Sequence, residues 1–125
     1  MNKELFEKGL KIRRQVVGDS YVDASLKGAD AFSMPMQELV TEFCWGEVWS
    51  RPGLDRRSRS ILNLGMIAAL NRPEELAAHV RGALNNGVTK DEIGECFLQV
   101  AVYVGMPAGL GCFKVARQVF KEMGI

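Results

Sequence analysis

The sequence predicts an all-α protein in which about six helices form one bundle. Apolar residues recur at helical spacing along most of the chain, and no stretch alternates as a strand would. The expected connections are short, with no linker or low-complexity segment. A chain of 125 residues is long enough for one hydrophobic core but not for two. We therefore expect a single domain over residues 1–125.

The first half of the chain is expected to hold two helices. The first covers residues 3–16, which are amphipathic, and residues 18–28 are expected to form an irregular connection. The second begins near Ser33 and Pro35, because proline is favoured in the first turn of a helix. It is expected to end before the Arg-Pro-Gly segment at 51–53.

A third helix over residues 55–70 has a basic first turn and is then apolar on almost every side. A helix that is apolar all round is buried all round. In a small domain this requires either a central position or a partner subunit. Three more helices are expected over residues 71–87, with Pro73 in the first turn and Gly87 as C-cap, 89–104, with a Thr89–Glu92 capping box, and 107–122.

Composition excludes several classes of function. The net charge of +1 gives no electrostatic signature of nucleic-acid or anionic-membrane binding. The N-terminus lacks the apolar core of a secretory signal, and no uncharged run is long enough to span a bilayer, so a cytoplasmic protein is expected. Cys44, Cys96 and Cys112 form no C-x-x-C pair, and we expect them to be small buried hydrophobes, with no metal site.

The single histidine lies in an apolar helix beside two charged residues. On a helical wheel Arg72, Glu75 and His79 fall on a strip about 60° wide at one border of the core stripe. Glu75 precedes His79 by four positions, so its carboxylate is placed to orient the imidazole and raise its pKa. This arrangement suits proton transfer. The alternative is a surface ion pair beside the core.

A second cluster combines aromatic and basic residues. Trp45 and Trp49 lie one helical turn apart, and four arginines, including Arg51 and Arg59, follow within ten residues. Arginine binds carboxylates through two hydrogen bonds, and aromatic walls shape pockets, so the cluster fits a small polyanionic substrate. The alternative is that the tryptophans belong to the core and the arginines solvate a helix start.

Four segments in order resemble the carboxymuconolactone decarboxylase family. They are YVD at 21–23, WGEVWSRPGLDRRSRSIL at 45–62, EELAAHVRGALNNGVTKDEI at 74–93 and QVAVYVGMPAG at 99–109. The likeness covers nearly the whole chain and is strongest to the members that act on 4-carboxymuconolactone in protocatechuate breakdown. It implies the all-helical fold shared with alkylhydroperoxidase D, and assembly into homotrimers or homohexamers.

The resemblance also implies where the site lies. The peroxidase branch carries a C-x-x-C-x-x-x-H motif, with a glutamate on the preceding helix. His79 matches the motif histidine, Glu75 and Arg72 stand at the two cysteine positions, and Ser60 stands at the glutamate position. The dithiol is absent here, which argues against thiol-dependent peroxide reduction by that mechanism. The match favours a catalytic role for Arg72, Glu75 and His79.

The implied reaction is cofactor-independent loss of CO2 from 4-carboxymuconolactone, giving 3-oxoadipate enol-lactone. The protein must bind a dianion, stabilise an oxyanion and deliver one proton. We expect arginines to perform the first two tasks and the His79–Glu75 pair the third, with Trp45, Trp49, Arg51 and Arg59 binding substrate. Two alternatives remain: a peroxiredoxin-type oxidoreductase using an isolated thiol such as Cys44, and a non-catalytic oligomeric binding protein.

Overall fold

A computed structural model describes all residues from Met1 to Ile125 and contains helices but no strands, which confirms the all-α prediction. Seven α-helices and one π-helix replace the six helices expected. Contacts within the chain divide it into two compact units, Met1–Arg56 and Arg57–Ile125. The expectation of one domain over residues 1–125 stays a prediction. None of the helices is both long enough and apolar enough to cross a membrane.

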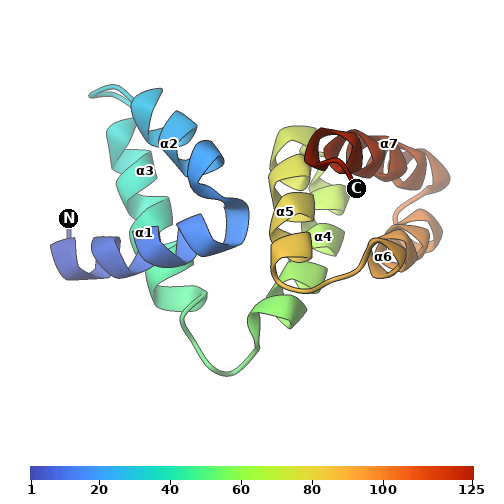
Figure 1. The fold of residues 1–125 in the computed structure, drawn as a ribbon, viewed down its shortest axis with the longest axis horizontal. Coiled ribbons are helices and arrows are strands. Elements are labelled where there is room, and N and C mark those ends of the chain that lie inside the picture. The colour runs from blue at the N-terminus through green and yellow to red at the C-terminus, as the bar shows by residue number, and fades with distance from the viewer. The chain divides into compact units, whose positions relative to one another are not determined.

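The first unit is built from four consecutive helices, drawn in blue to green in Figure 1. They are α1 (Lys3–Val17), α2 (Asp19–Lys27), α3 (Met34–Leu39) and the π-helix η1 (Val40–Val48). The expectation of an irregular connection over residues 18–28 is wrong. Gly18, at a φ of 93°, turns the chain at one residue, and a new helix follows that buries Val22 in the core.

The expected second helix changes its winding after Leu39 and continues as η1. At this change α1 crosses very close to η1, with Gly9 and Gly46 at the crossing. A Cβ atom on Gly9 would lie 1.9 Å from the carbonyl oxygen of Thr41, so only glycine fits there. Trp45 and Trp49 point into the same core as Val22.

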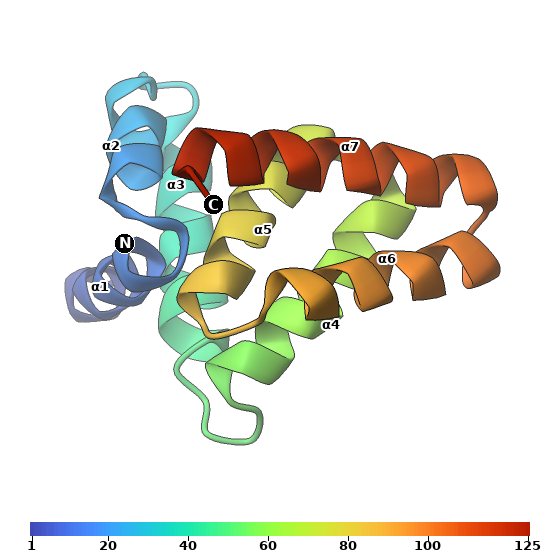
Figure 2. The same ribbon diagram turned by 45° about the vertical axis from the view of Figure 1, so that its right-hand side comes forward.

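The second unit contains two helical hairpins: α4 (Arg56–Leu70) with α5 (Pro73–Asn85), and α6 (Lys90–Tyr103) with α7 (Met106–Met123). Figure 2 shows α6 and α7 lying side by side and running in opposite directions. The Thr89–Glu92 capping box at the start of α6 is confirmed, because each side chain bonds the other's backbone N–H. Leu64, Val80, Phe97 and Val119 lie at the centre of this unit's core.

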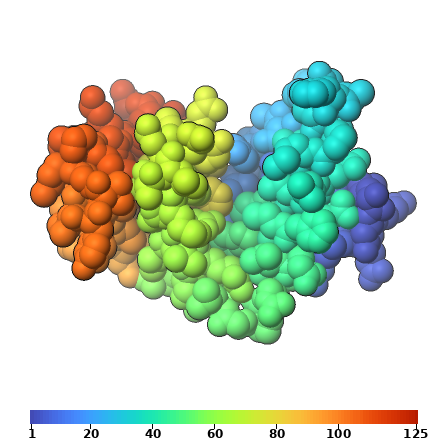
Figure 3. Space-filling view, turned by 180° about the vertical axis from the view of Figure 1, so that it is seen from behind, coloured from blue at the N-terminus to red at the C-terminus, as the bar shows by residue number.

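Helix α4 departs from its sequence-based expectation. It buries Ser60, Leu64 and Ala68, one face only, and leaves Leu62 and Leu70 at 53% and 65% exposure. A central position for α4 is therefore excluded, and its burial against a partner subunit stays a prediction. Figure 3 shows α4 in yellow-green at the molecular surface.

Candidate active site

Polar side chains meet where α4 packs against α5. The Asn86 side-chain amide donates to the Ser60 hydroxyl at 2.9 Å, and Ser60 is fully buried. Farther along the two helices, Asn63 Nδ2 lies 3.5 Å from Nδ1 of the half-buried His79. The amide donates to Nδ1 in the tautomer whose ring proton is on Nε2.

Burial sets the charge state of His79. Desolvation lowers its pKa from the ordinary 6.5 to about 4, and the nearby Glu75 carboxylate offsets part of this effect. The sequence-based expectation gave the correct sign for Glu75 but the wrong direction for the overall pKa. At neutral pH the free protein therefore holds an uncharged imidazole, in which one ring nitrogen can accept a proton and the other donates a hydrogen bond.

The sequence analysis did not predict the contact of Asn63 with His79. The sequence does contain an indication of it: Asn63 is an amide within the otherwise apolar stretch ILNLGMIAAL, and an amide that faces the core needs a hydrogen-bond partner. Arg59 lies one turn before Asn63 on the same face of α4 and is half-buried. The helical spacing thus places Arg59, which was predicted to bind substrate, on the side of α4 that carries Asn63.

Arg72 does not share the helix with Glu75 and His79. Helix α5 begins at Pro73, and Arg72 is the N-cap residue, with a φ of −119° and a ψ of 81°. Its Nη1 donates to the carbonyl oxygens of Leu70 and Asn71, at 3.4 and 3.5 Å. The expected helical strip therefore begins only at Glu75, because the turn at Asn71, with a φ of 55°, sets the direction of Arg72.

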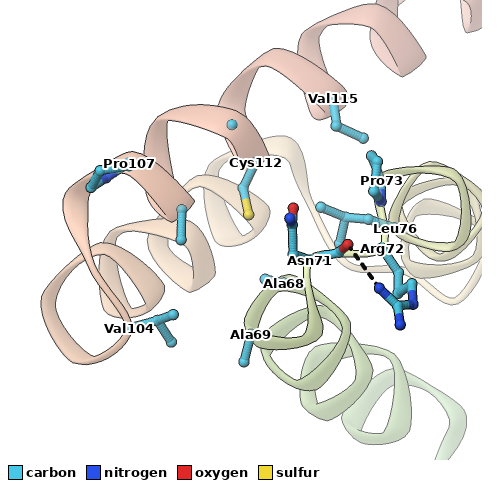
Figure 4. Close-up of a pocket in the computed structure, with 12 residues that line it drawn as sticks. Ala68, Ala69, Asn71, Arg72, Pro73, Leu76, Val104, Pro107, Cys112 and Val115 are labelled. Carbon is cyan, nitrogen blue, oxygen red and sulfur yellow. Dashed lines mark hydrogen bonds between the residues drawn. The ribbon is translucent and has the colours of Figure 1, made fainter.

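Arg72 borders a mainly apolar cavity of about 420 Å³ between the α4–α5 turn and α7. In Figure 4 the thiol of Cys112 points into this cavity, whereas the Arg72 guanidinium turns away from it. Glu75 and His79 do not line the cavity. Of the three predicted catalytic residues, only Arg72 therefore lines this cavity.

The residues of the aromatic and basic cluster differ in burial. Trp45 and Trp49 are 4% and 5% exposed, and their rings stack at a centroid distance of 4.8 Å in the core of the first unit. This packing favours the structural alternative for both tryptophans. Arg51 is exposed in the segment after η1, and Arg57 forms a salt bridge with Glu92. The proposed binding roles of Trp45, Trp49 and Arg51 stay predictions.

The cysteines have the properties of structural thiols. Cys44 and Cys96 are half-buried, Cys112 is buried, and none forms a disulfide. Burial raises the pKa of all three thiols, which disfavours the reactive thiolate. No group of three or more His, Cys, Asp and Glu side chains is arranged to hold a metal ion.

Comparison with known proteins places this site in a family. The sequence pattern of the carboxymuconolactone decarboxylase family matches residues 35–118. A 4-carboxymuconolactone decarboxylase of Acinetobacter baylyi is 41% identical over 99% of this chain and 92% of its own length. A nitrosuccinic acid decarboxylase of Metarhizium robertsii is 46% identical over 98% of this chain and 86% of its own length. The chain therefore belongs to the carboxymuconolactone decarboxylase family and is an enzyme of the carboxy-lyase class.

Proposed function

We propose that the chain decarboxylates 4-carboxymuconolactone, or a similar small dicarboxylate lactone, without a cofactor. The observation that carries this proposal is the α4–α5 contact, where Asn63 meets a neutral His79 and Arg59 lies one turn away. Together, an arginine and an imidazole supply an anchor for a carboxylate and a carrier for a proton.

The reaction needs only these two kinds of group. The bond between the ring carbon and the leaving carboxylate breaks, and its electron pair moves through the C=C bond to the lactone carbonyl oxygen. CO2 leaves, and one proton then bonds to carbon to give 3-oxoadipate enol-lactone. Arg59, with Arg72 as a second candidate, binds a carboxylate or the developing oxyanion. His79 exchanges the proton, and Glu75 favours the protonated ring.

The neutral resting state of His79 gives this proposal a specific order of events. A bound dianion adds negative charge beside the imidazole, which raises its pKa and favours uptake of a proton from solvent. The imidazolium then donates that proton to carbon. Binding of a non-reactive dicarboxylate such as cis,cis-muconate is expected to be coupled to proton uptake between pH 5 and 7, roughly the interval where a raised histidine pKa would lie.

Nitrosuccinic acid is the second candidate substrate, because the relative from Metarhizium is named for its decarboxylation. Loss of CO2 from the carbon that bears the nitro group places the electron pair on the nitro oxygens as a nitronate. Protonation at carbon then gives 3-nitropropanoate. Both substrates are dicarboxylates with an electron acceptor conjugated to the carbon that loses CO2, so the same arginine and histidine roles serve either reaction.

The test measures CO2 release from each substrate by the purified chain. His79→Gln is expected to lower kcat by about 10²- to 10⁴-fold, the usual contribution of a general acid or base. Glu75→Gln should lower kcat by a smaller factor. The control Glu74→Gln removes another exposed charge on the same turn and should leave kcat almost unchanged. Arg59→Ala and Arg72→Ala should raise KM if they anchor a carboxylate and lower kcat if they bind the oxyanion.

Two results would overturn the proposal. Absence of CO2 release from both substrates by the folded wild-type chain would exclude this substrate class. If His79→Gln kept the wild-type kcat/KM across pH 6 to 8, the histidine would be a border residue without a catalytic role. Far-UV circular dichroism on each variant separates loss of activity from loss of fold.

We also propose that the chain acts as a homotrimer or homohexamer. An apolar surface supports this assembly: Leu62, Met66 and Leu70 follow one exposed face of α4, and Tyr103 and Met106 are exposed where α6 meets α7. Figure 3 shows these two regions on one face, in yellow-green and orange. Exposed apolar surfaces of soluble proteins often mark protein–protein contacts when they are contiguous.

A further inference from the structure

A second pocket lies between α6 and α7, away from the Asn63–His79 contact. Its volume is about 520 Å³, within the size range of small-molecule sites, and it is formed entirely by the second unit. None of Arg59, Asn63, Glu75 or His79 lines it. The pocket therefore has no part in the proposed decarboxylation.

The wall of this pocket is aromatic. Phe97, which is fully buried, and Phe113 meet edge to face with ring centroids 5.9 Å apart, and Phe120 supplies a third ring. Gly94 lines the α6 side, where an added Cβ atom would make only an ordinary contact, 3.8 Å from Phe113. Aromatic walls of this kind receive flat or branched apolar groups through edge and face contacts.

The rim of the pocket is cationic. Lys90, Arg117 and Lys121 line it, and no acidic side chain does. Nζ of Lys90 lies 4.8 Å from the centre of the Phe120 ring, so a cation–π contact holds one ammonium at the edge of the aromatic wall. None of the three cations forms a salt bridge, whereas the neighbouring acids Glu92 and Glu122 pair with Arg57 and Arg81.

From this juxtaposition we infer that the α6–α7 pocket binds an amphipathic carboxylate, with an aromatic or branched apolar body against the phenylalanines and the carboxylate at Lys90, Arg117 and Lys121. Burial of the apolar body requires the aromatic wall, and the three cations supply charge-assisted hydrogen bonds. Neither feature alone defines this ligand class: a polar anion would leave the phenylalanines unused, and a neutral ligand would leave the cations unused.

Equilibrium dialysis with three probes on the whole chain tests the inference. We expect 3-phenylpropanoate to bind, while acetate, which has the charge without the body, and 3-phenylpropanol, which has the body without the charge, bind at least about ten-fold more weakly. The double variant Arg117→Gln/Lys121→Gln should raise the Kd of 3-phenylpropanoate by about ten-fold or more. The matched control Lys8→Gln/Lys11→Gln removes two exposed lysines of α1 and should leave that Kd unchanged.

A second pair of variants tests the shape of the pocket without altering its charge. Gly94→Leu should fill the space beside Phe113 and abolish binding, whereas Gly94→Ala adds only an ordinary contact and should preserve it. Three results would overturn the inference: equal binding of the acid and the alcohol, an unchanged Kd in the double variant, or displacement of 3-phenylpropanoate by cis,cis-muconate. The last would assign the probe to the dicarboxylate site. Sedimentation, run beside dialysis, tests whether a second copy of the chain occupies the pocket instead. A Kd of 3-phenylpropanoate that changes with the assembly state would be a fourth result against the inference.

Discussion

His79 is expected to make the fold sensitive to mild acid. The imidazole is neutral in both the folded and the unfolded chain above pH 6.5. As the pH falls below that value the unfolded chain takes up a proton, whereas the folded chain resists until about pH 4. Stability that is fully present above pH 6.5 is therefore lost progressively down to about pH 4.

The size of this loss follows from the two pKa values. The difference between 6.5 and about 4, at about 1.4 kcal/mol for each pH unit, corresponds to about 3 kcal/mol once the loss is complete. At pH 5 the same linkage gives about 2 kcal/mol relative to pH 7.5. Against a total stability of about 5–15 kcal/mol for a typical protein, a loss of this size is readily measured.

The assay compares urea unfolding of the wild type and His79→Gln at pH 7.5 and pH 5. Carboxylates titrate in both proteins, so the difference between their two losses isolates the histidine; the wild type should lose about 2 kcal/mol more. Since the chain has a single histidine, its ring signals in an NMR titration also report the folded pKa directly. Equal losses in both proteins, together with a titration near 6.5, would refute the conclusion that burial lowers the pKa of His79.

Three further predictions concern packing, thiols and assembly. In thermal unfolding, Gly9→Ala and Gly109→Ala should each destabilise the fold by about 2 kcal/mol or more. The Cβ added at Gly9 would lie 1.9 Å from Thr41 O, and the one added at Gly109 would lie 2.5 Å from Ala101 Cβ. The control Gly65→Ala adds a Cβ that meets nothing within 4 Å and should be neutral or stabilising. Serine at Cys44, Cys96 or Cys112 should leave CO2 release intact apart from losses of stability, and an inactive but folded Cys44→Ser would instead support a thiol mechanism. Sedimentation at micromolar concentration should give a trimer or hexamer, and a stable monomer would contradict the assembly proposed from the exposed face of α4.

The candidate site shows which of its features can be predicted from residue spacing within one helix. Glu75 and His79 share α5, and the four-residue spacing correctly placed a carboxylate whose charge favours the imidazolium. The pKa of His79 is nevertheless lowered overall, because burial of the ring outweighs the effect of Glu75 and depends on what packs over the ring. Asn63 belongs to a different helix, and its contact with His79 depends on how α4 lies against α5. The spacing of residues within one helix predicts neither the burial of His79 nor its contact with Asn63.

The sequence by itself determined the helical class, the capping box at Thr89, the core stripe of α5 and the family, because these depend on local spacing and on the order of motifs along the chain. Tertiary structure decided the rest. It showed that residues 19–27 form a helix, because Val22 gains a core to pack against. It moved Arg72 off α5, stacked the two tryptophans inside the first unit, and left His79 uncharged. The turn at Asn71 sets the direction of Arg72. The other outcomes depend on which surfaces are desolvated, and desolvation is set by neighbours that are distant in sequence.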